Sequence, residues 1–197
     1  MDLLKQIAKI RAGYPFRGRI EPVPDGRTRV VQIRDVLSSG EVSLDGLIRT
    51  EVEERRGEHL LRKGDVLFIS RGTRRYAAAV TGEPDSVIAS GQLFVLTPVP
   101  GVLPEFLAWL INQRPAQQYL GENAAGSNVR IITRPVLERL RVDIPPLETQ
   151  QKIVSVHKLS LREQSLLAAI AERRARLVEE SLLRSLKNSN EDDRSSL

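Results

Sequence analysis

The chain of 197 residues contains no cysteine and only two histidines. Disulfides, thiolate zinc sites and cysteine nucleophiles are therefore excluded, and two histidines are few for a transition-metal site. His59 lies in a charged run and His157 in a long helical segment, so we expect both on the solvated surface rather than in a catalytic site. The composition predicts a scaffold that holds neither a metal nor a cofactor.

Long hydrophobic runs are also missing. No apolar segment approaches the roughly 18 residues that a membrane helix requires. The first five residues, Met1-Asp2-Leu3-Leu4-Lys5, lack the layout of a signal peptide. We therefore expect a cytoplasmic protein without a membrane segment.

Glycine and proline are absent from the C-terminal part of the chain. All 13 glycines and all 11 prolines lie at or before Pro146. Because these two residues mark turns and interrupt helices, their distribution divides the chain. It predicts a turn-rich domain over residues 1–146, one long helix over 147–187 and a flexible polar tail over 188–197.

Short apolar runs between turns predict the class of the first domain. We expect an α+β fold with a mixed, many-stranded sheet and short helices, followed by the long C-terminal helix. Three prolines stand where first-turn prolines belong and predict three short helices, beginning near Pro104, Pro115 and Pro135. The predicted strands cover residues 30–33, 36–37, 66–70, 77–80 and 87–96.

The common catalytic signatures do not occur. The sequence has no Gly-x-x-x-x-Gly-Lys-Ser/Thr loop, no Gly-x-Gly-x-x-Gly and no His-Glu-x-x-His. Metal-dependent nucleases usually place a carboxylate two positions before a lysine, and neither Glu-x-Lys nor Asp-x-Lys is present. We therefore predict no catalytic residue and no metal site, and a binding function remains.

Arginine supplies most of the positive charge, with 24 of the 30 cationic residues and a net charge of +5. Its planar guanidinium suits phosphate and guanine, although a GC-rich genome would enrich arginine everywhere. Three loops are the predicted nucleic-acid contacts. The first holds Arg71, Thr73, Arg74, Arg75 and Tyr76, the second Ser127, Asn128 and Arg130, and the third Tyr14, Arg17 and Arg19. For each loop the alternative is a solvated rim or an intramolecular ion pair.

The predicted long helix carries an interrupted apolar stripe, formed by Ile153, Val156, Leu159, Leu166, Leu167, Ile170, Leu177 and Leu182. Glu163 and Arg174 stand where a strict heptad requires apolar residues, which argues against a long parallel coiled coil. An antiparallel helix pair accommodates these charges more easily. A lone helix cannot bury its stripe, so we expect it to bind a partner.

Five segments together resemble the specificity subunits of type I restriction-modification systems. They follow one another over nearly the whole chain: Gly13-Tyr14-Pro15-Phe16-Arg17-Gly18-Arg19, Val31-Gln32-Ile33-Arg34-Asp35-Val36, Leu61-Arg62-Lys63-Gly64-Asp65-Val66-Leu67-Phe68, Ala125-Gly126-Ser127 and Ile144-Pro145-Pro146-Leu147-x-x-Gln150-x-x-Ile153-Val154. The resemblance implies a non-catalytic target-recognition domain for double-stranded DNA. It also implies a helix that spaces domains and docks DNA methyltransferase subunits, and it leaves open whether a restriction subunit joins the complex.

Two features depart from this family's usual pattern. Thr149 stands where the family usually has a glutamate, and the chain has one recognition domain and one helix where two of each are typical. The chain thus resembles a half-subunit, and two copies could pair their helices antiparallel and read a bipartite palindrome. The alternatives are a stand-alone enzyme that cleaves or modifies DNA, and a helix-mediated assembly protein without a role on DNA.

Overall fold

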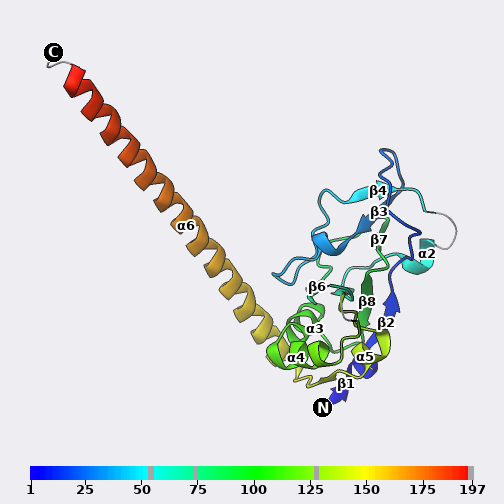
Figure 1. Cartoon of the computed structure of the whole chain (residues 1–197). Helices are drawn as coiled ribbons and strands as arrows, with labels where there is room; N and C mark the ends of the chain where they lie inside the picture. Colours follow the sequence, from blue (N-terminus) through cyan, green and yellow to red (C-terminus); the bar gives the residue numbers. More distant parts are fainter. Residues whose placement is uncertain (53–55, 73–74, 127–128, 195–197) are drawn as a thin grey trace. The chain divides into compact units, whose positions relative to one another are not determined.

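A computed structural model describes residues 1–52, 56–72, 75–126 and 129–194 (Figure 1). The contacts divide the chain into two units, Met1–Val154 and Ser155–Leu197. The first unit holds all the strands and all the short helices of the described residues, and the second holds most of the C-terminal helix. The predicted α+β class with a long C-terminal helix is confirmed.

The first unit contains a four-stranded, a three-stranded and a two-stranded sheet. The four-stranded antiparallel sheet has the order β2 (Ala8–Ala12), β8 (Leu93–Pro98), β5 (Val66–Ile69) and β6 (Ala77–Ala79). In the three-stranded sheet, β3 (Thr28–Val31) pairs antiparallel with β4 (Ile48–Thr50) and parallel with β7 (Val87–Ala89). The two-stranded sheet joins β1 (Asp2–Leu3) to β9 (Arg141–Val142).

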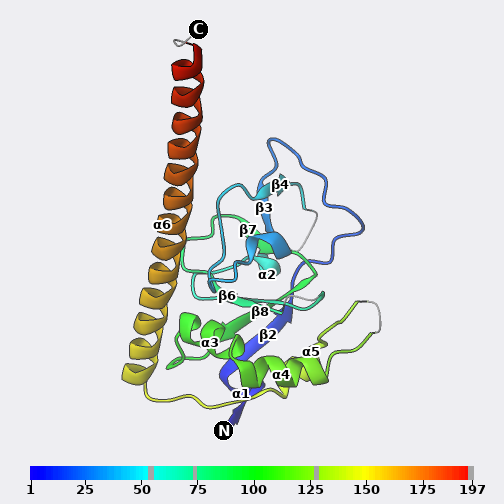
Figure 2. The ribbon, with the colours of Figure 1, turned by 60° about the vertical axis from the view of Figure 1, so that its left-hand side comes forward.

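Three short helices begin at prolines, as the sequence predicts. Each has its proline in the first turn, where the missing N–H would have no partner within the helix: α3 (Pro104–Ile111), α4 (Arg114–Glu122) and α5 (Arg134–Glu138). The remaining short helices of the described residues are α1 (Leu4–Ile7), the 3₁₀ turn Ile33–Asp35 and α2 (Arg56–His59). Figure 2 shows α3, α4 and α5 on the opposite side of the four-stranded sheet from β3, β4 and β7.

The central strand β5 explains why this unit has two hydrophobic cores. Its four residues are all buried, and successive side chains of a strand point to opposite faces. Val66 and Phe68 pack with residues of α1, α3, α4 and α5 in the first core. Leu67 and Ile69 pack with residues of β3 and β7 in the second. A continuous apolar run is therefore required here, in place of the alternating pattern of a sheet with one wet face.

The predicted strand over residues 36–37 is wrong, and the one over 30–33 ends at Val31 with β3. Residues 33–35 form the 3₁₀ turn, because the Asp35 carboxylate accepts a hydrogen bond from the backbone N–H of Gln32 and closes a turn there. Val36 is left with one isolated bridge to Val42. Ile131 forms isolated bridges to Ala125 and to Arg71.

The long helix α6 spans Leu147–Arg194 and therefore runs past Lys187, where we expected it to end. Neither glycine nor proline stops it, which is consistent with this extension. Of the predicted stripe, the seven residues beyond Val154 are 54–67% exposed within this chain. Among the helices of the described residues, none combines the length and the hydropathy of a membrane span.

Candidate nucleic-acid interface

Two of the predicted binding loops meet at one polar pocket of about 450 Å³ in the first unit. Arg19 comes from the loop after β2 and Arg71 from the end of β5, and both are exposed. The rest of the lining is Pro15, Phe16, Gly18, Ile20, Gln32, Ser90, Gly91 and Gln92. Sequence analysis quoted Pro15, Phe16, Gly18 and Gln32 only as parts of the segments that carry the resemblance, and it did not name the other four.

The first of these loops begins with a close approach of two backbones. Gly13 N–H donates to the Leu93 carbonyl at 2.9 Å, and Tyr14 N–H donates to the Ala89 carbonyl at 2.7 Å. A Cβ on Gly13 would lie 2.2 Å from the Ser90 carbonyl oxygen, a distance that no side chain tolerates. Glycine at position 13 therefore allows the loop to pass directly beside Ser90 and to form one wall of the pocket.

Two buried polar atoms in the pocket lining make no hydrogen bond to any described residue. They are the Ser90 hydroxyl oxygen and the Gln32 amide nitrogen Nε2, and Ser90 as a whole is only 5% exposed. A buried donor without a partner costs about 1–3 kcal/mol. Because both atoms have almost no accessible surface, neither offers a contact to a ligand in the pocket, and the exposed charged groups of the lining are the two arginines.

Tyr14, in the loop that begins at Gly13, is the centre of an aromatic cluster. The Tyr14 ring packs edge-on against Phe16 at 4.8 Å and against His59 at 5.3 Å between ring centroids. His59 is half-buried and its Nδ1 has no hydrogen-bond partner among the described residues. Our expectation of a solvated His59 was therefore wrong, because the sequence does not show that Tyr14 covers it.

The loop at Arg71 is tied to the segment that follows the Ser127 loop. Gly72 N–H donates to the Arg130 carbonyl at 3.0 Å, and Ile132 N–H donates to the Ser70 carbonyl at 2.8 Å. Gly72 has a φ of 104°, a value that glycine adopts without strain. These bonds hold the backbone on both sides of Arg71 and leave its side chain exposed at the pocket.

Other predicted contact residues are engaged within the unit. The Arg75 guanidinium lies against α4, where a Cβ on Gly121 would come within 3.4 Å of its Nη2. Arg130 donates to the Gly121 carbonyl at 2.9 Å, and Tyr76 packs on the second core. Arg17 is exposed outside the pocket lining. Thr73, Arg74, Ser127 and Asn128 lie outside the described residues. For all of these residues, contact with DNA stays a prediction.

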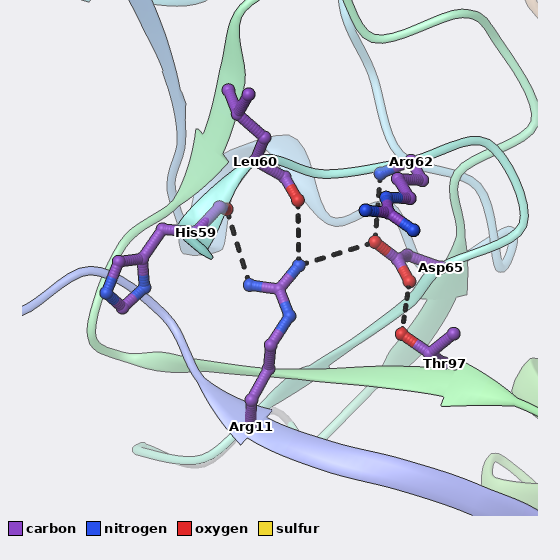
Figure 3. Close-up of polar contacts among 6 residues, drawn as sticks. All are labelled: Arg11, His59, Leu60, Arg62, Asp65 and Thr97. Atoms are coloured by element: carbon purple, nitrogen blue, oxygen red, sulfur yellow. Dashed lines mark hydrogen bonds and ion pairs between the residues drawn. The ribbon is translucent and has the colours of Figure 1, made fainter. Parts of the chain in front are cut away.

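A buried carboxylate connects β2, the turn before β5, and β8 (Figure 3). Asp65 is 2% exposed, and its Oδ1 accepts from the Thr97 hydroxyl at 2.6 Å. Its Oδ2 accepts from the Arg62 N–H at 2.9 Å and lies 3.5 Å from Arg11 Nη2. The same Nη2 donates to the Leu60 carbonyl at 2.9 Å. This set of bonds, the Asp65 network, fixes the turn before β5 to the end of β2.

Burial is the main cause of an altered pKa in this network. The pKa of the Arg11 guanidinium is lowered by desolvation, and the nearby Asp65 carboxylate partly offsets that effect. Arginine still keeps its proton at neutral pH. Arg11 therefore remains a cation between a carboxylate and two backbone carbonyls, two residues before the loop that begins at Gly13.

A family model described as the type I restriction modification DNA specificity domain matches residues 4–161. The chain belongs to this family. The match covers the pocket, the Asp65 network and the start of α6, so the resemblance read from the five sequence segments is confirmed.

Relatives and solved structures agree with this membership in the specificity family. The chain is 28% identical over 131 residues to the type I restriction enzyme HindI specificity subunit of Haemophilus influenzae, covering 61% of this chain. A solved HsdS subunit from Thermoanaerobacter tengcongensis matches with a TM-score of 0.60 and 17% identity over 84% of this chain. A structure from work on complex assembly and conformational transition of the type I R-M system matches with a TM-score of 0.57 and 18% identity over 89%.

This family member spans much less than its relatives. The chain covers 28% of the length of the HindI subunit. It covers 38% of the HsdS chain and 41% of the other solved chain. The matched part corresponds to a fraction of each of these proteins.

The segment after Pro145-Pro146 belongs to the last of the five segments that carry the resemblance, and it attaches α6 to the first unit. Gln150 is fully buried, and its amide oxygen accepts from the Leu103 N–H at 2.9 Å. Its amide nitrogen donates to the carbonyls of Gly101 and Pro145, each at 2.9 Å. Three hydrogen bonds thus hold the first turns of α6 within the first unit, which extends to Val154. Ile153, predicted as part of the free stripe, lines a pocket of this unit together with Trp109.

The described residues offer no metal centre. Among them, no group of three or more histidine or acidic side chains is placed to hold an ion. The polar pocket offers two exposed guanidinium groups, those of Arg19 and Arg71, and guanidinium groups suit phosphate.

Proposed function

We propose that this chain is a non-catalytic DNA-recognition subunit of a type I restriction-modification complex. Residues 1–146 would form the recognition domain, and residues 147–187 a helix that binds a second copy and DNA methyltransferase subunits. The observation that carries the proposal is the specificity-domain match over residues 4–161, which includes the arginine-lined pocket.

The proposed homodimer rests on the exposed stripe of α6. Seven large apolar residues of the stripe are more than half exposed within this chain, and a helix with such a face normally buries it against a partner. The partner we propose for this face is a second copy of the chain, which would bring a second recognition domain.

The two charged interruptions suggest a register for the pair. A two-fold axis between Ala168 and Ala169 would place Glu163 opposite Arg174 of the second copy, and the reverse, so that both charges find partners. The same axis would set Leu167 opposite Ile170 of the second copy. Opposite charges across an interface fix register more than they add affinity. An antiparallel pair built this way would carry the recognition domains at its two ends and read a bipartite palindrome.

Light scattering tests the dimer directly. The full chain should have twice the mass of one copy at micromolar concentration, and a chain ending at Val154 should be monomeric. Ending it at Pro146 would also remove Gln150 from the first unit, so that version would confuse assembly with folding. A full-length chain that is monomeric and still binds one DNA sequence specifically would contradict the dimer but not the recognition role.

Selection of bound duplexes from a random pool tests recognition. We expect two copies of one short sequence in inverted orientation at a fixed spacing. Arg71→Ala should cost about 1–3 kcal/mol and relax one position if this side chain reads a base, or weaken all sequences alike if it contacts phosphate. Arg139→Ala, at an exposed arginine outside the pocket, is the matched control.

The two alternatives predict different results in the same experiments. A stand-alone enzyme would cleave or modify DNA when supplied with magnesium or a methyl donor, without another subunit. An assembly protein without a role on DNA would select no sequence, and Arg71→Ala would then change nothing. Co-purification with a DNA methyltransferase subunit, lost on removal of residues 155–197, would support the docking role of α6.

A further inference from the structure

The lining of the polar pocket contains one exposed side chain that is polar and uncharged, that of Gln92. Its amide makes no hydrogen bond to any described residue. A glutamine amide holds two donors and an acceptor side by side, and here all of them are available to a ligand. The exposed cations Arg19 and Arg71 belong to the same lining, so a free amide lies in a site that also suits phosphate.

The backbone of Gln92 is fixed by its neighbours. Its carbonyl oxygen accepts two hydrogen bonds from Ser70, one from the N–H at 3.0 Å and one from the hydroxyl at 2.7 Å. The next residue, Leu93, is fully buried and begins β8. Because Ser70 directly precedes Arg71, the same two bonds bring the backbone of Gln92 next to that of Arg71. A contact residue on a rigid element is positioned more precisely than one on a loose loop.

The turn before Gln92 lies against the loop that carries Phe16. A Cβ on Gly91 would lie 3.1 Å from the Tyr14 carbonyl oxygen and 3.4 Å from the Pro15 Cα, so the two backbones are in contact. Phe16 is partly exposed, and its ring packs edge-on against Tyr14 at 4.8 Å between centroids. Phe16 and Gln92 both line the pocket. An apolar ring and a free amide are therefore available in the same site.

These groups match the edge that an A·T base pair presents in the major groove. Adenine presents the N7 acceptor and the N6 amino donor side by side, and a glutamine amide pairs with both. Thymine presents a methyl group, which apolar side chains such as phenylalanine contact. Guanine instead presents two acceptors, which suit arginine, and cytosine presents an amino donor, which suits a carboxylate. Adenine is therefore the base that the Gln92 amide fits best.

We propose that Gln92 is a specificity-determining residue that reads the adenine of one A·T pair in the major groove. Its amide would donate to N7 and accept from the N6 amino group, and Phe16 would contact the methyl group of the paired thymine. Arg19 and Arg71 would contact phosphates beside this pair. The inference rests on the proposed DNA-recognition function and names the base that the pocket recognises. Sequence analysis did not identify Gln92 as a contact residue.

Two substitutions of Gln92 test the pattern of donors and acceptors on the full chain. Gln92→Glu offers acceptors only, so selection from random duplexes should change one position of each half-site from adenine to cytosine, whose N4 amino group donates. Gln92→Ala should accept all four bases at that position. Gln151→Glu, at an exposed glutamine of α6, is the matched control and should keep adenine. Thermal unfolding of each variant shows whether it is folded.

Modified duplexes test the same contact on the original chain, so a variant that does not fold leaves the inference testable. A 7-deazaadenine at the selected position lacks the N7 acceptor and should weaken binding by about tenfold. The same duplex should bind Gln92→Ala as well as the unmodified one does. Uracil in place of the paired thymine lacks the methyl group and should also weaken binding, and equal binding of uracil would refute the contact of Phe16.

The outcomes separate this inference from the proposed function. Specific binding in which Gln92→Ala and Gln92→Glu select the original bases would refute the role of Gln92 and leave the recognition role intact. Equal weakening of all sequences by Gln92→Ala would make this side chain a contact to the DNA backbone and would also refute base reading. A chain that selects no sequence would overturn the recognition role, and this inference with it.

Discussion

Replacing Asp65 by alanine should destabilise the recognition domain by about 3 kcal/mol. The carboxylate is 2% exposed and accepts hydrogen bonds from Thr97 and from the Arg62 N–H, while Arg11 lies 3.5 Å away. Breaking a buried ion pair costs about 3–5 kcal/mol. Arg11 keeps its bonds to the carbonyls of His59 and Leu60, so the lower end of that range applies.

Asparagine at the same position separates charge from hydrogen bonding. Its amide oxygen can face Arg62 and Arg11, and its amide nitrogen can donate to the Thr97 hydroxyl oxygen. Asp65→Asn therefore loses the charge but keeps most partners, and should cost about 1–2 kcal/mol. Asp45→Ala, at an exposed aspartate, is the control and should stay within about 0.5 kcal/mol of the original chain.

Urea unfolding of the full chain, followed by circular dichroism and by tryptophan fluorescence, measures these differences. The single tryptophan, Trp109, lies on α3 and reports the first unit. A loss of about 3 kcal/mol is a large share of the free energy of unfolding of an ordinary domain, which is about 5–15 kcal/mol. If Asp65→Ala unfolds at the same urea concentration as Asp45→Ala, the network does not hold the turn before β5 and our reasoning is refuted.

Three further predictions concern the start of α6, the pocket wall and the dimer. Gln150→Ala should cost about 2–3 kcal/mol in thermal unfolding, because it leaves two carbonyls and one N–H unpaired, whereas exposed Gln151→Ala should be near neutral. Gly13→Ala should abolish specific DNA binding and lower the melting temperature, since its Cβ would collide with the Ser90 carbonyl; Gly57→Ala, with open space around it, should do neither. Glu163→Arg and Arg174→Glu should each weaken the dimer in light scattering, and the double variant should restore it. Equal dimerisation of all three would contradict the proposed register.

Some features of the site could be read from the sequence only in part. Arg19 and Arg71 were predicted as contact residues, and both are exposed at the pocket. Arg75 and Tyr76 were predicted beside them, but they pack against α4 and the second core. Consecutive residues leaving a strand point in different directions, and only the elements packed around the loop decide which of them stay exposed.

The sequence by itself determined the features that depend on neighbouring residues. Prolines at first turns started three helices, the absence of glycine and proline after Pro146 let α6 continue, and a continuous apolar run became the doubly buried strand β5. The tertiary structure alone decided the features that depend on residues far apart in the chain. Gln32 and Ser90 come together because β3 pairs in parallel with β7, and Gln150 is buried because the segment before α3 offers it matching partners. Such pairings join residues far apart in the chain, and no local pattern records them.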